Sequence, residues 1–283
     1  MAEITAQMIK ELRERTGVGM GKCKEALEAS KGDMELAIEN LRKAGVASAV
    51  KKAGRETKEG QIATSENKET LAIIEVNAET DFVVKNERFQ NFLKKIAEEV
   101  AKTHPASLEA FLNQKLSENS GTTIDQMRAE MVHTIGENIQ IKRLQTFKKD
   151  GKRSFGVYSH LGGKIVTVVE IEGAPGEEDL AKDIAMHVAA ASPDYLVPSE
   201  VPVETIEQEK EIAKSQLKGK PENIIDKILT GKIEAYYDQV CLTRQKFIRN
   251  DSLSIAELVE KRSKETGKPL KLVSFVRWNV GQS

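Results

Sequence analysis

Several features that would commit a chain to one class of protein are scarce in these 283 residues. There are only two cysteines, Cys23 and Cys241, which lie far apart among helix-forming residues, so we expect reduced thiols and no disulfide scaffold. No apolar stretch is long enough to span a bilayer. The 43 basic residues balance 44 acidic ones, so composition indicates no strong attraction to nucleic acid or to a membrane. With 31% charged and 5% aromatic residues, the chain is typical of a soluble, helix-rich protein.

Motifs of the common enzyme and metal-site classes are also missing. The histidines, which show no metal-ligand spacing, are His104, His133, His160 and His187. The sequence contains no G-x-x-x-x-G-K-[ST] loop and no G-x-S-x-G elbow, and residues 18–21 (Val-Gly-Met-Gly) lack the spacing of a dinucleotide loop. Cys23 lies at helical spacing from Ala26 and Leu27, which favours a core position. We therefore expect a protein that is not an enzyme, with no catalytic residue, metal or cofactor.

The N-terminal residues lead directly into an acidic amphipathic helix. They show neither the apolar core of a signal peptide nor the Arg- and Ser-rich composition of a transit peptide. Together with the reduced cysteines, this predicts a cytoplasmic protein.

Residues 1–54 are predicted to form a module of three helices and a linker. Thr5 and Asp33 are good N-cap residues for the first and third helices, and the third helix is expected to end near Gly45. The apolar positions of these helices recur at helical spacing. The glycine-rich loop between the first two helices, with an exposed Met20, resembles that of ubiquitin-associated (UBA) three-helix domains.

Residues 42–58 are rich in lysine and arginine and allow two interpretations. They can be a basic arm for RNA, or a solvated extension of the third helix followed by a linker. The second is favoured, because no aromatic residue is interleaved to stack on a base and because Glu56 and Glu59 dilute the charge.

An internal repeat organises the rest of the chain into two related α+β lobes, predicted at residues 55–140 and 141–283. Each lobe begins with a β-hairpin, whose second strand is residues 71–76 in the first lobe and 165–171 in the second, followed by an amphipathic helix. The helices align through matching apolar positions: Ile96, Ala97, Val100 and Ala101 against Ile184, Ala185, Val188 and Ala189. Residues 270–278 are predicted to be a final strand that completes the second sheet.

Between strand and helix, the first lobe carries Thr80, Asp81, Phe82 and Val83. Thr80 and Asp81 are good N-cap residues. Phe82 can fold back as a staple on the next helix or project into another molecule. The second lobe has the ordinary turn Gly-Ala-Pro-Gly at residues 173–176, with no aromatic residue, and this difference favours projection.

A polar antiparallel helical hairpin is predicted as an insertion at about residues 198–237. Its two helices contain few apolar residues and are joined at residues 218–221 (Lys-Gly-Lys-Pro). We expect such a projecting hairpin to contact a partner or a second copy, so a homodimer through the hairpin is one expectation.

Four stretches together resemble the bacterial translation elongation factor Ts family. They are residues 11–20 (Glu-Leu-Arg-Glu-Arg-Thr-Gly-Val-Gly-Met), 80–86 (Thr-Asp-Phe-Val-x-x-Asn), 135–139 (Ile-Gly-Glu-Asn-Ile) and 184–190 (Ile-Ala-Met-His-Val-Ala-Ala). The resemblance runs from the first helix to the last strand. It implies a guanine-nucleotide exchange factor for the GTPase elongation factor Tu, with no nucleic acid or membrane required.

The resemblance also implies the contacts with that partner. Asp81 and Phe82, with Thr80 and Val83 beside them, would wedge near the nucleotide and Mg²⁺ site and promote GDP release until GTP rebinds. The further implied partner-binding residues are Arg13, Met20, Lys24, Ile135, Gly136 and His160. Two departures are expected to shift binding toward Met20 and Phe82: Gly21 stands where well-known members have Met, and no further helix follows the last strand.

An RNA-binding protein that uses residues 42–58 and the helical hairpin remains the alternative. The two functions differ in salt dependence, because phosphate contacts make RNA affinity fall steeply with salt, whereas a contact centred on Phe82 depends little on it.

Overall fold

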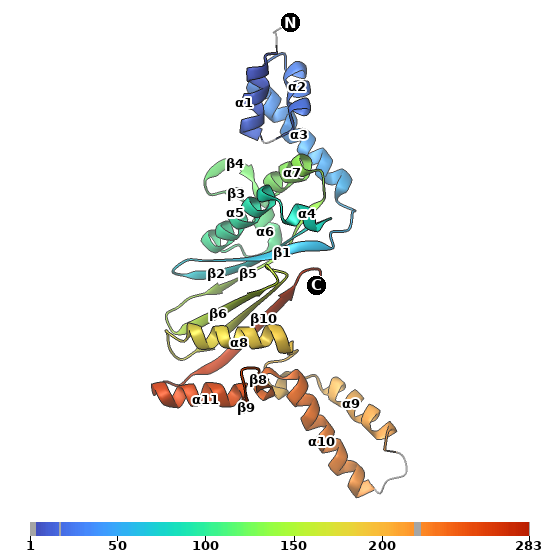
Figure 1. Cartoon of the computed structure of the whole chain (residues 1–283), viewed down its shortest axis with the longest axis vertical. Coiled ribbons are helices and arrows are strands. Elements are labelled where there is room, and N and C mark those ends of the chain that lie inside the picture. The colour runs from blue at the N-terminus through green and yellow to red at the C-terminus, as the bar shows by residue number, and fades with distance from the viewer. Residues whose placement is uncertain (1–3, 17, 218–221, 283) are drawn as a thin grey trace. The chain divides into compact units, whose positions relative to one another are not determined.

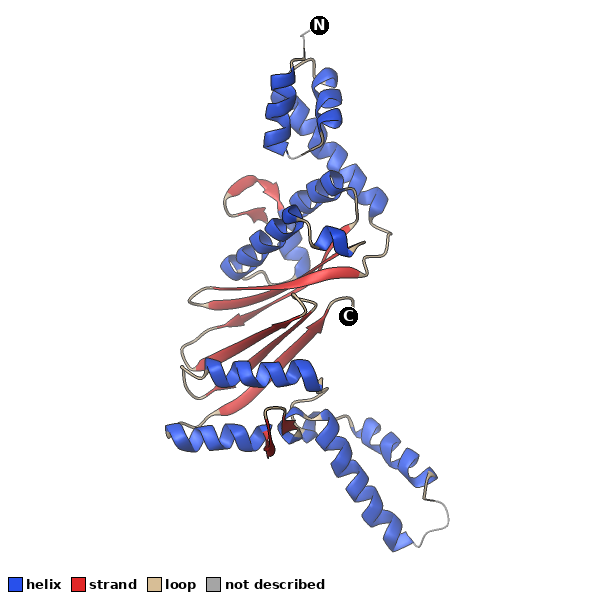
Figure 2. Ribbon diagram, viewed as in Figure 1, coloured by secondary structure: helices blue, strands red, loops and turns tan. Residues whose placement is uncertain are grey.

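The computed structural model describes residues 4–16, 18–217 and 222–282. The chain forms two compact units, Met1–Lys148 with Asn279–Ser283, and Lys149–Trp278. Within the described residues, no helix is long and apolar enough to cross a membrane. The fold is mixed α+β, as predicted, with N-terminal helices and two lobes that each contain a sheet (Figures 1 and 2).

The N-terminal module consists of α1 (Ala6–Thr16), α2 (Met20–Ala29) and α3 (Met34–Lys52). The side chain of Asp33 accepts a hydrogen bond from the backbone N–H of Leu36 and thereby caps α3. The expected end of the third helix near Gly45 is wrong. Helix α3 continues through Gly45 to Lys52, and there it packs against α7 of the first lobe, near the backbone of Ala129.

In the first lobe, a three-stranded antiparallel sheet of order β1–β2–β5 has α5 lying across β1 and β2. Strand β2 is buried along its whole length, and β2 and β5 pair as far as Ala78 opposite Ile139. The elements are β1 (Glu59–Glu66), β2 (Thr70–Ala78), α4 (Asp81–Val84), α5 (Glu87–Thr103), α6 (Leu108–Asn113), β3 (Lys115–Leu116), β4 (Asn119–Thr123), α7 (Ile124–Ile135) and β5 (Ile139–Lys148). Strand β5 belongs to the first unit, so residues 141–148 lie there, whereas the predicted division placed them in the second lobe.

The second lobe repeats this plan with a sheet of order β10–β7–β6. The predicted final strand joins this sheet as β10, and α8 lies across β6 and β7 (Figure 2). The elements are β6 (Arg153–His160), β7 (Ile165–Glu172), α8 (Glu178–Ala191), the 3₁₀ helix η1 (Pro198–Glu200), α9 (Val203–Ser215), α10 (Glu222–Val240), the 3₁₀ helix η2 (Leu242–Arg244), β8 (Lys246–Phe247), β9 (Asn250–Ser254), α11 (Ile255–Thr266) and β10 (Lys271–Asn279).

The two lobes correspond in structural detail beyond the predicted hairpin and helix. Each contains a small hairpin, β3–β4 or β8–β9, followed by a helix that begins with a capping box and ends on a glycine with positive φ. Those glycines are Gly136 (φ 96°) and Gly267 (φ 66°). Glu99 in the first lobe accepts a hydrogen bond from the backbone N–H of Ser117, and His187 in the second accepts one from Ile248 in the same way.

The helical hairpin is present as α9 and α10, and α9 begins close to the predicted position. Helix α10 extends to Val240, beyond the predicted end, because Tyr236, Tyr237 and Val240 continue its apolar side and pack with Tyr195 and Val201. The predicted connection at residues 218–221 lies outside the described residues. Self-association through this hairpin stays a prediction.

Candidate functional site

The stretch after β2 forms an ordered turn in which neighbouring side chains point in different directions. Thr80 is the N-cap of the single-turn helix α4, and its hydroxyl accepts a hydrogen bond from the backbone N–H of Val83 at 3.4 Å. Val83 and Val84 are buried in the core of the first lobe, whereas Phe82 is 81% exposed. A staple would be covered by the following helix, so the projecting interpretation of Phe82 agrees with the structure.

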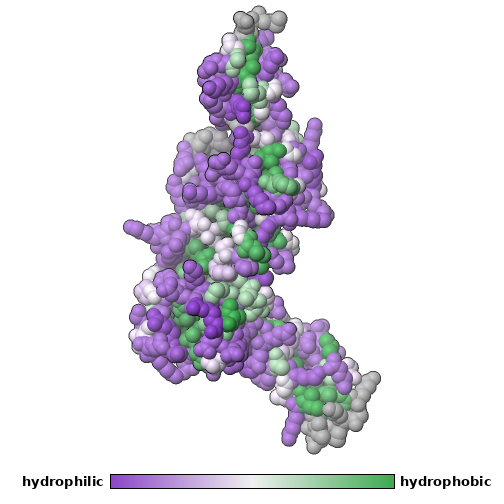
Figure 3. Space-filling view, in the orientation of Figure 1, coloured by the Kyte–Doolittle hydropathy of each residue, from purple (hydrophilic) through white to green (hydrophobic). Residues whose placement is uncertain are grey.

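Phe82 is the most exposed large hydrophobic side chain among the described residues. In the view of Figure 3, hydrophilic residues cover most of the surface and hydrophobic ones form separate patches. An isolated aromatic ring on an ordered turn has the form of an anchor for another molecule, because burying it removes a large apolar area from water.

Asp81 directly precedes Phe82 in the chain and carries a carboxylate. Lys85 donates a hydrogen bond to it from Nζ at 2.8 Å, one helical turn away. This hydrogen bond is the largest cause of the lowered pKa of Asp81, so the group carries a negative charge at neutral pH. The side chain of Asp81 is 46% exposed and is therefore accessible to a partner.

The turn at the end of α7 is held directly against this stretch. Gly136 ends α7 with φ 96°, a backbone conformation that favours glycine, and Ile135 packs partly buried against the core of the lobe. The next residue, Glu137, accepts hydrogen bonds from the backbone N–H and the hydroxyl of Thr80. The structure thus brings Ile135 and Gly136 together with residues 80–83, although 57 residues separate Thr80 from Glu137.

The predicted contact residues of the N-terminal module lie on α1 and α2. Met20 is the first residue of α2 and is 53% exposed, and Arg13 and Lys24 are also exposed. Lys24 forms an exposed ion pair with Glu28 at 3.7 Å. The neighbouring Gly21 has open space where a side chain would be.

His160 belongs to the second unit, at the exposed end of β6. Its Nδ1 lies 3.2 Å from the hydroxyl of Tyr158, and the two rings stack with centroids 6.0 Å apart. Leu161, which follows, has φ 50° and is 69% exposed. His160 thus stands on an exposed hairpin end beside an apolar side chain.

Comparison with known proteins identifies the family. The sequence model described as Elongation factor TS matches residues 79–282. The chain is 68% identical over 282 residues to the elongation factor Ts of Protochlamydia amoebophila, with all of both chains covered. It is 43% identical over 281 residues to those of Chlamydia muridarum and Chlamydia caviae, which covers 99% of this chain and 100% of each relative. The chain belongs to the elongation factor Ts family.

Membership of the elongation factor Ts family makes this chain a translation elongation factor. The matched range begins at Glu79 and therefore contains the turn that carries Phe82 and the junction between α7 and β5. The N-terminal module lies outside that range but inside the alignments with the whole-length relatives.

The basic segment at residues 42–58 is largely engaged with acids of the chain itself. Its first part is the end of α3, as the helix-extension interpretation predicted. The ion pairs are Arg42 with Glu130 (3.4 Å), Lys43 with Glu39 (2.7 Å), Arg55 with Glu79 (3.4 Å) and Lys58 with Glu56 (2.8 Å). These contacts give no support to a basic arm for RNA.

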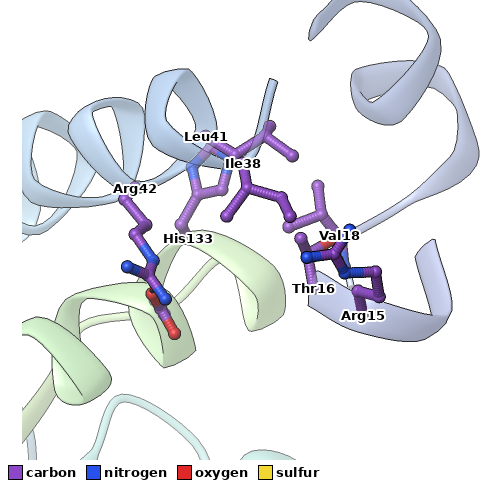
Figure 4. A pocket seen from close by; sticks show the side chains of 8 residues that line it. Arg15, Thr16, Val18, Ile38, Leu41, Arg42 and His133 are labelled. Carbon is purple, nitrogen blue, oxygen red and sulfur yellow. Dashed lines mark hydrogen bonds and ion pairs between the residues drawn. The ribbon is translucent and has the colours of Figure 1, made fainter. Parts of the chain in front are cut away.

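A small cavity lies between the N-terminal module and α7, beside their packed contact (Figure 4). Its volume is about 60 Å³, which is far below the 300 Å³ or more of typical ligand pockets. Figure 4 shows the His133 ring lying beside Leu41 and Arg42. Burial, with Lys22 and Lys52 nearby, lowers the pKa of His133, so the ring is neutral at neutral pH. The cavity does not have the size of a nucleotide site.

Sequence reasoning missed two carboxylates of this site, Glu79 and Glu137. Glu137 belongs to the motif at residues 135–139, but the sequence indicated no role for it. Its partner Thr80 belongs to a distant motif, and a sequence alone does not show that the two motifs meet.

Proposed function

We propose that this chain is the guanine-nucleotide exchange factor of elongation factor Tu, and that Phe82 is the side chain it buries in that partner. The observation that carries the proposal is the 81% exposure of Phe82 on a turn whose neighbours Val83 and Val84 are buried. The family to which the chain belongs supports the choice of partner.

The proposed mechanism is a competition between two binding events on one GTPase. Burying a phenylalanine side chain contributes about 1.5–3 kcal/mol. This is the size of a typical coupling between two sites, which corresponds to about 5–150-fold in affinity. A partner conformation that accepts Phe82 binds GDP and Mg²⁺ less well, and by linkage bound nucleotide weakens the contact with Phe82. GDP then leaves, and GTP rebinding displaces the exchange factor.

Asp81 is the polar companion of the aromatic ring in this proposal. Its carboxylate is ionised and partly exposed, so it can compete for hydrogen-bond donors that hold the Mg²⁺ coordination shell of the partner. Thr80 and Val83 hold the turn in place from either side of the pair.

The remaining contacts divide between the two units. We assign Arg13, Met20 and Lys24 of the N-terminal module to the nucleotide-binding domain of the partner, and Ile135 and Gly136 to the surface around the wedge. His160, on the second unit, is assigned to a different domain of the partner.

The test measures release of a fluorescent GDP analogue from elongation factor Tu with and without this protein. The unmodified chain should accelerate release, and Phe82→Ala should reduce the acceleration by roughly 10–150-fold, the equivalent of one buried phenylalanine. A suitable control is Ile248→Ala, which truncates an apolar side chain that is 47% exposed and lies outside all the predicted contacts. The proposal is wrong if Phe82→Ala and the control exchange nucleotide equally fast.

A further inference from the structure

The sheet of the first lobe ends in an unusual way, next to the turn that carries Phe82. Strands β2 and β5 pair through backbone hydrogen bonds up to Ala78 opposite Ile139. Beyond that pair, side chains replace the backbone as acceptors. The N–H of Thr80 donates to Oε2 of Glu137 at 3.0 Å, and its hydroxyl donates to Oε1 at 2.8 Å.

A second carboxylate makes the same kind of contact in the opposite direction. The backbone N–H of Asn138 donates to Oε1 of Glu79 at 2.6 Å. Each of the two segments thus supplies one carboxylate to the backbone of the other. We call Glu79, Thr80, Glu137 and Asn138 the reciprocal clamp. Asn138 is fully buried, and its amide also donates to the carbonyl of Arg55 at 2.8 Å.

The clamp continues into the helix that carries the exposed ring. The Thr80 hydroxyl that donates to Glu137 also accepts from the N–H of Val83. Helix α4 has four residues, which is too short to be stable by itself. The ring of Phe82 is exposed and has little packing of its own, so its direction depends on how firmly the backbone of α4 is held.

We propose that Glu137 is a positioning residue for Phe82: through Thr80 it fixes the direction in which the ring projects, and it thereby sets how fast nucleotide leaves the partner. This inference rests on the proposed function. It adds a residue that need not touch the partner and that acts through the geometry of the turn.

The second lobe shows that closing such a sheet does not itself require a carboxylate. At the corresponding junction, Gly173 packs so closely on the carbonyl of Pro269 that an added Cβ would overlap it. The turn that follows β7 carries no exposed aromatic ring, and Ala174 in that turn is buried. Among the described residues of the second lobe, this turn has neither a projecting aromatic ring nor a pair of carboxylates like the clamp, as expected if the clamp serves the ring.

The experiment compares Glu137→Ala, Glu137→Gln, Phe82→Ala and the double variant Glu137→Ala/Phe82→Ala. The rate of GDP release from elongation factor Tu is measured against exchange-factor concentration, which separates the maximal rate from the concentration that gives half of it. Hydrogen bonds to a charged acceptor are among the stronger ones, so Glu137→Ala should lower the maximal rate by roughly tenfold. Glutamine can still accept from the Thr80 N–H, so Glu137→Gln should recover most of that rate.

The double variant separates positioning from general loss of structure. If Glu137 acts through Phe82, then Glu137→Ala should change the rate by less than about twofold once Phe82 is alanine. The matched control is Glu257→Ala on α11, which removes a carboxylate that accepts the backbone N–H of Ser254 at 2.6 Å in the second lobe. Its effect on release should be small and the same with and without Phe82.

A fluorine label on the ring at position 82 gives a readout that does not depend on exchange. Its ¹⁹F NMR spectrum should show a single resonance in the unmodified chain and in Glu137→Gln. In Glu137→Ala, the chemical shift should move toward that of the free fluorinated phenylalanine. If Glu137→Ala does not fold, Thr80→Val, which removes the hydroxyl that donates to Glu137, carries the same comparison.

Three outcomes are decisive. Equal slowing by Glu137→Ala with and without Phe82, or no slowing, overturns the positioning role while the proposed function stands. If Phe82→Ala exchanges as fast as the unmodified chain, the proposed function fails and the inference fails with it. The inference is supported if Glu137→Ala lowers the maximal rate of GDP release only when Phe82 is present, and if Glu137→Gln restores that rate.

Discussion

Phe82 and Val83 are consecutive residues of one helical turn, yet Phe82 is 81% exposed and Val83 is 8% exposed. The larger apolar side chain is therefore the one left in water. The smaller one packs in the core of the first lobe, where it anchors the turn.

This contrast predicts opposite effects on stability and on exchange. Val83→Ala should lower the free energy of unfolding by about 1–3 kcal/mol, because it removes buried methyl groups. Phe82→Ala should change it by less than about 0.5 kcal/mol, as expected for an exposed position. Urea denaturation measures both, and a large loss in Phe82→Ala would show that the ring is part of the core.

The proposed role of Asp81 in displacing Mg²⁺ predicts an effect that depends on the metal. Asp81→Ala should slow GDP release from elongation factor Tu, and the defect should shrink when Mg²⁺ is chelated, because the metal that Asp81 helps to displace is already gone. Asp125→Ala is a control, since this acid on α7 pairs with Arg128 at 2.7 Å. A defect of the same size with and without Mg²⁺ would argue against a metal-linked role.

His187 predicts a loss of stability in mild acid. The ring is buried; its Nδ1 accepts from the N–H of Ile248 at 3.3 Å, and its Nε2 lies 2.9 Å from Oε1 of Gln245. Burial lowers the pKa of His187 below the ordinary histidine value of about 6.5, against a smaller opposing effect of the Gln245 hydrogen bond. Below pH 6.5 the unfolded chain therefore binds the proton more readily, and stability falls as the pH falls through this range.

Urea denaturation between pH 5 and pH 8 tests this expectation. In His187→Gln, the free energy of unfolding should depend less steeply on pH below about 6.5 than in the unmodified chain. Part of the slope should remain, because His133 also has a lowered pKa. If the free energy of unfolding depends equally on pH in the two proteins, burial of His187 does not contribute to the loss of stability in acid.

Two glycines of the second unit predict opposite responses to alanine. Gly156 lies on β6, and an added Cβ would overlap the backbone of Ala181 and Lys182 in α8, so Gly156→Ala should destabilise by about 1–3 kcal/mol. Gly231 lies within α10 with open space around it, so Gly231→Ala should stabilise by up to about 1 kcal/mol. Thermal unfolding of both variants checks the signs, and a tolerated Gly156→Ala would contradict the close packing of α8 on β6.

Local patterns were sufficient to predict the longer elements. The period of the apolar residues in α5 and α8, such as Val100 and Val188, indicated both helices and their relation. The strands of the small hairpins β3–β4 and β8–β9 were missed. Strands β3 and β8 have two residues each, too few to show an alternation, and β4 and β9 are almost entirely polar. Gly45 was predicted to end a helix, but α3 continues through it to Lys52 and packs on α7, a tertiary contact that local patterns do not show.

The amino-acid sequence by itself determined the periodic elements, the repeat and the motifs that indicate the family, because each of these is a property of neighbouring residues. It also singled out Phe82, since the second lobe has no aromatic residue in its place. Only the tertiary structure decided that this ring is exposed and that Glu137 holds its turn. Exposure depends on what packs around a side chain, and the hydrogen bonds between Thr80 and Glu137 form only when β2 and β5 lie side by side in the sheet.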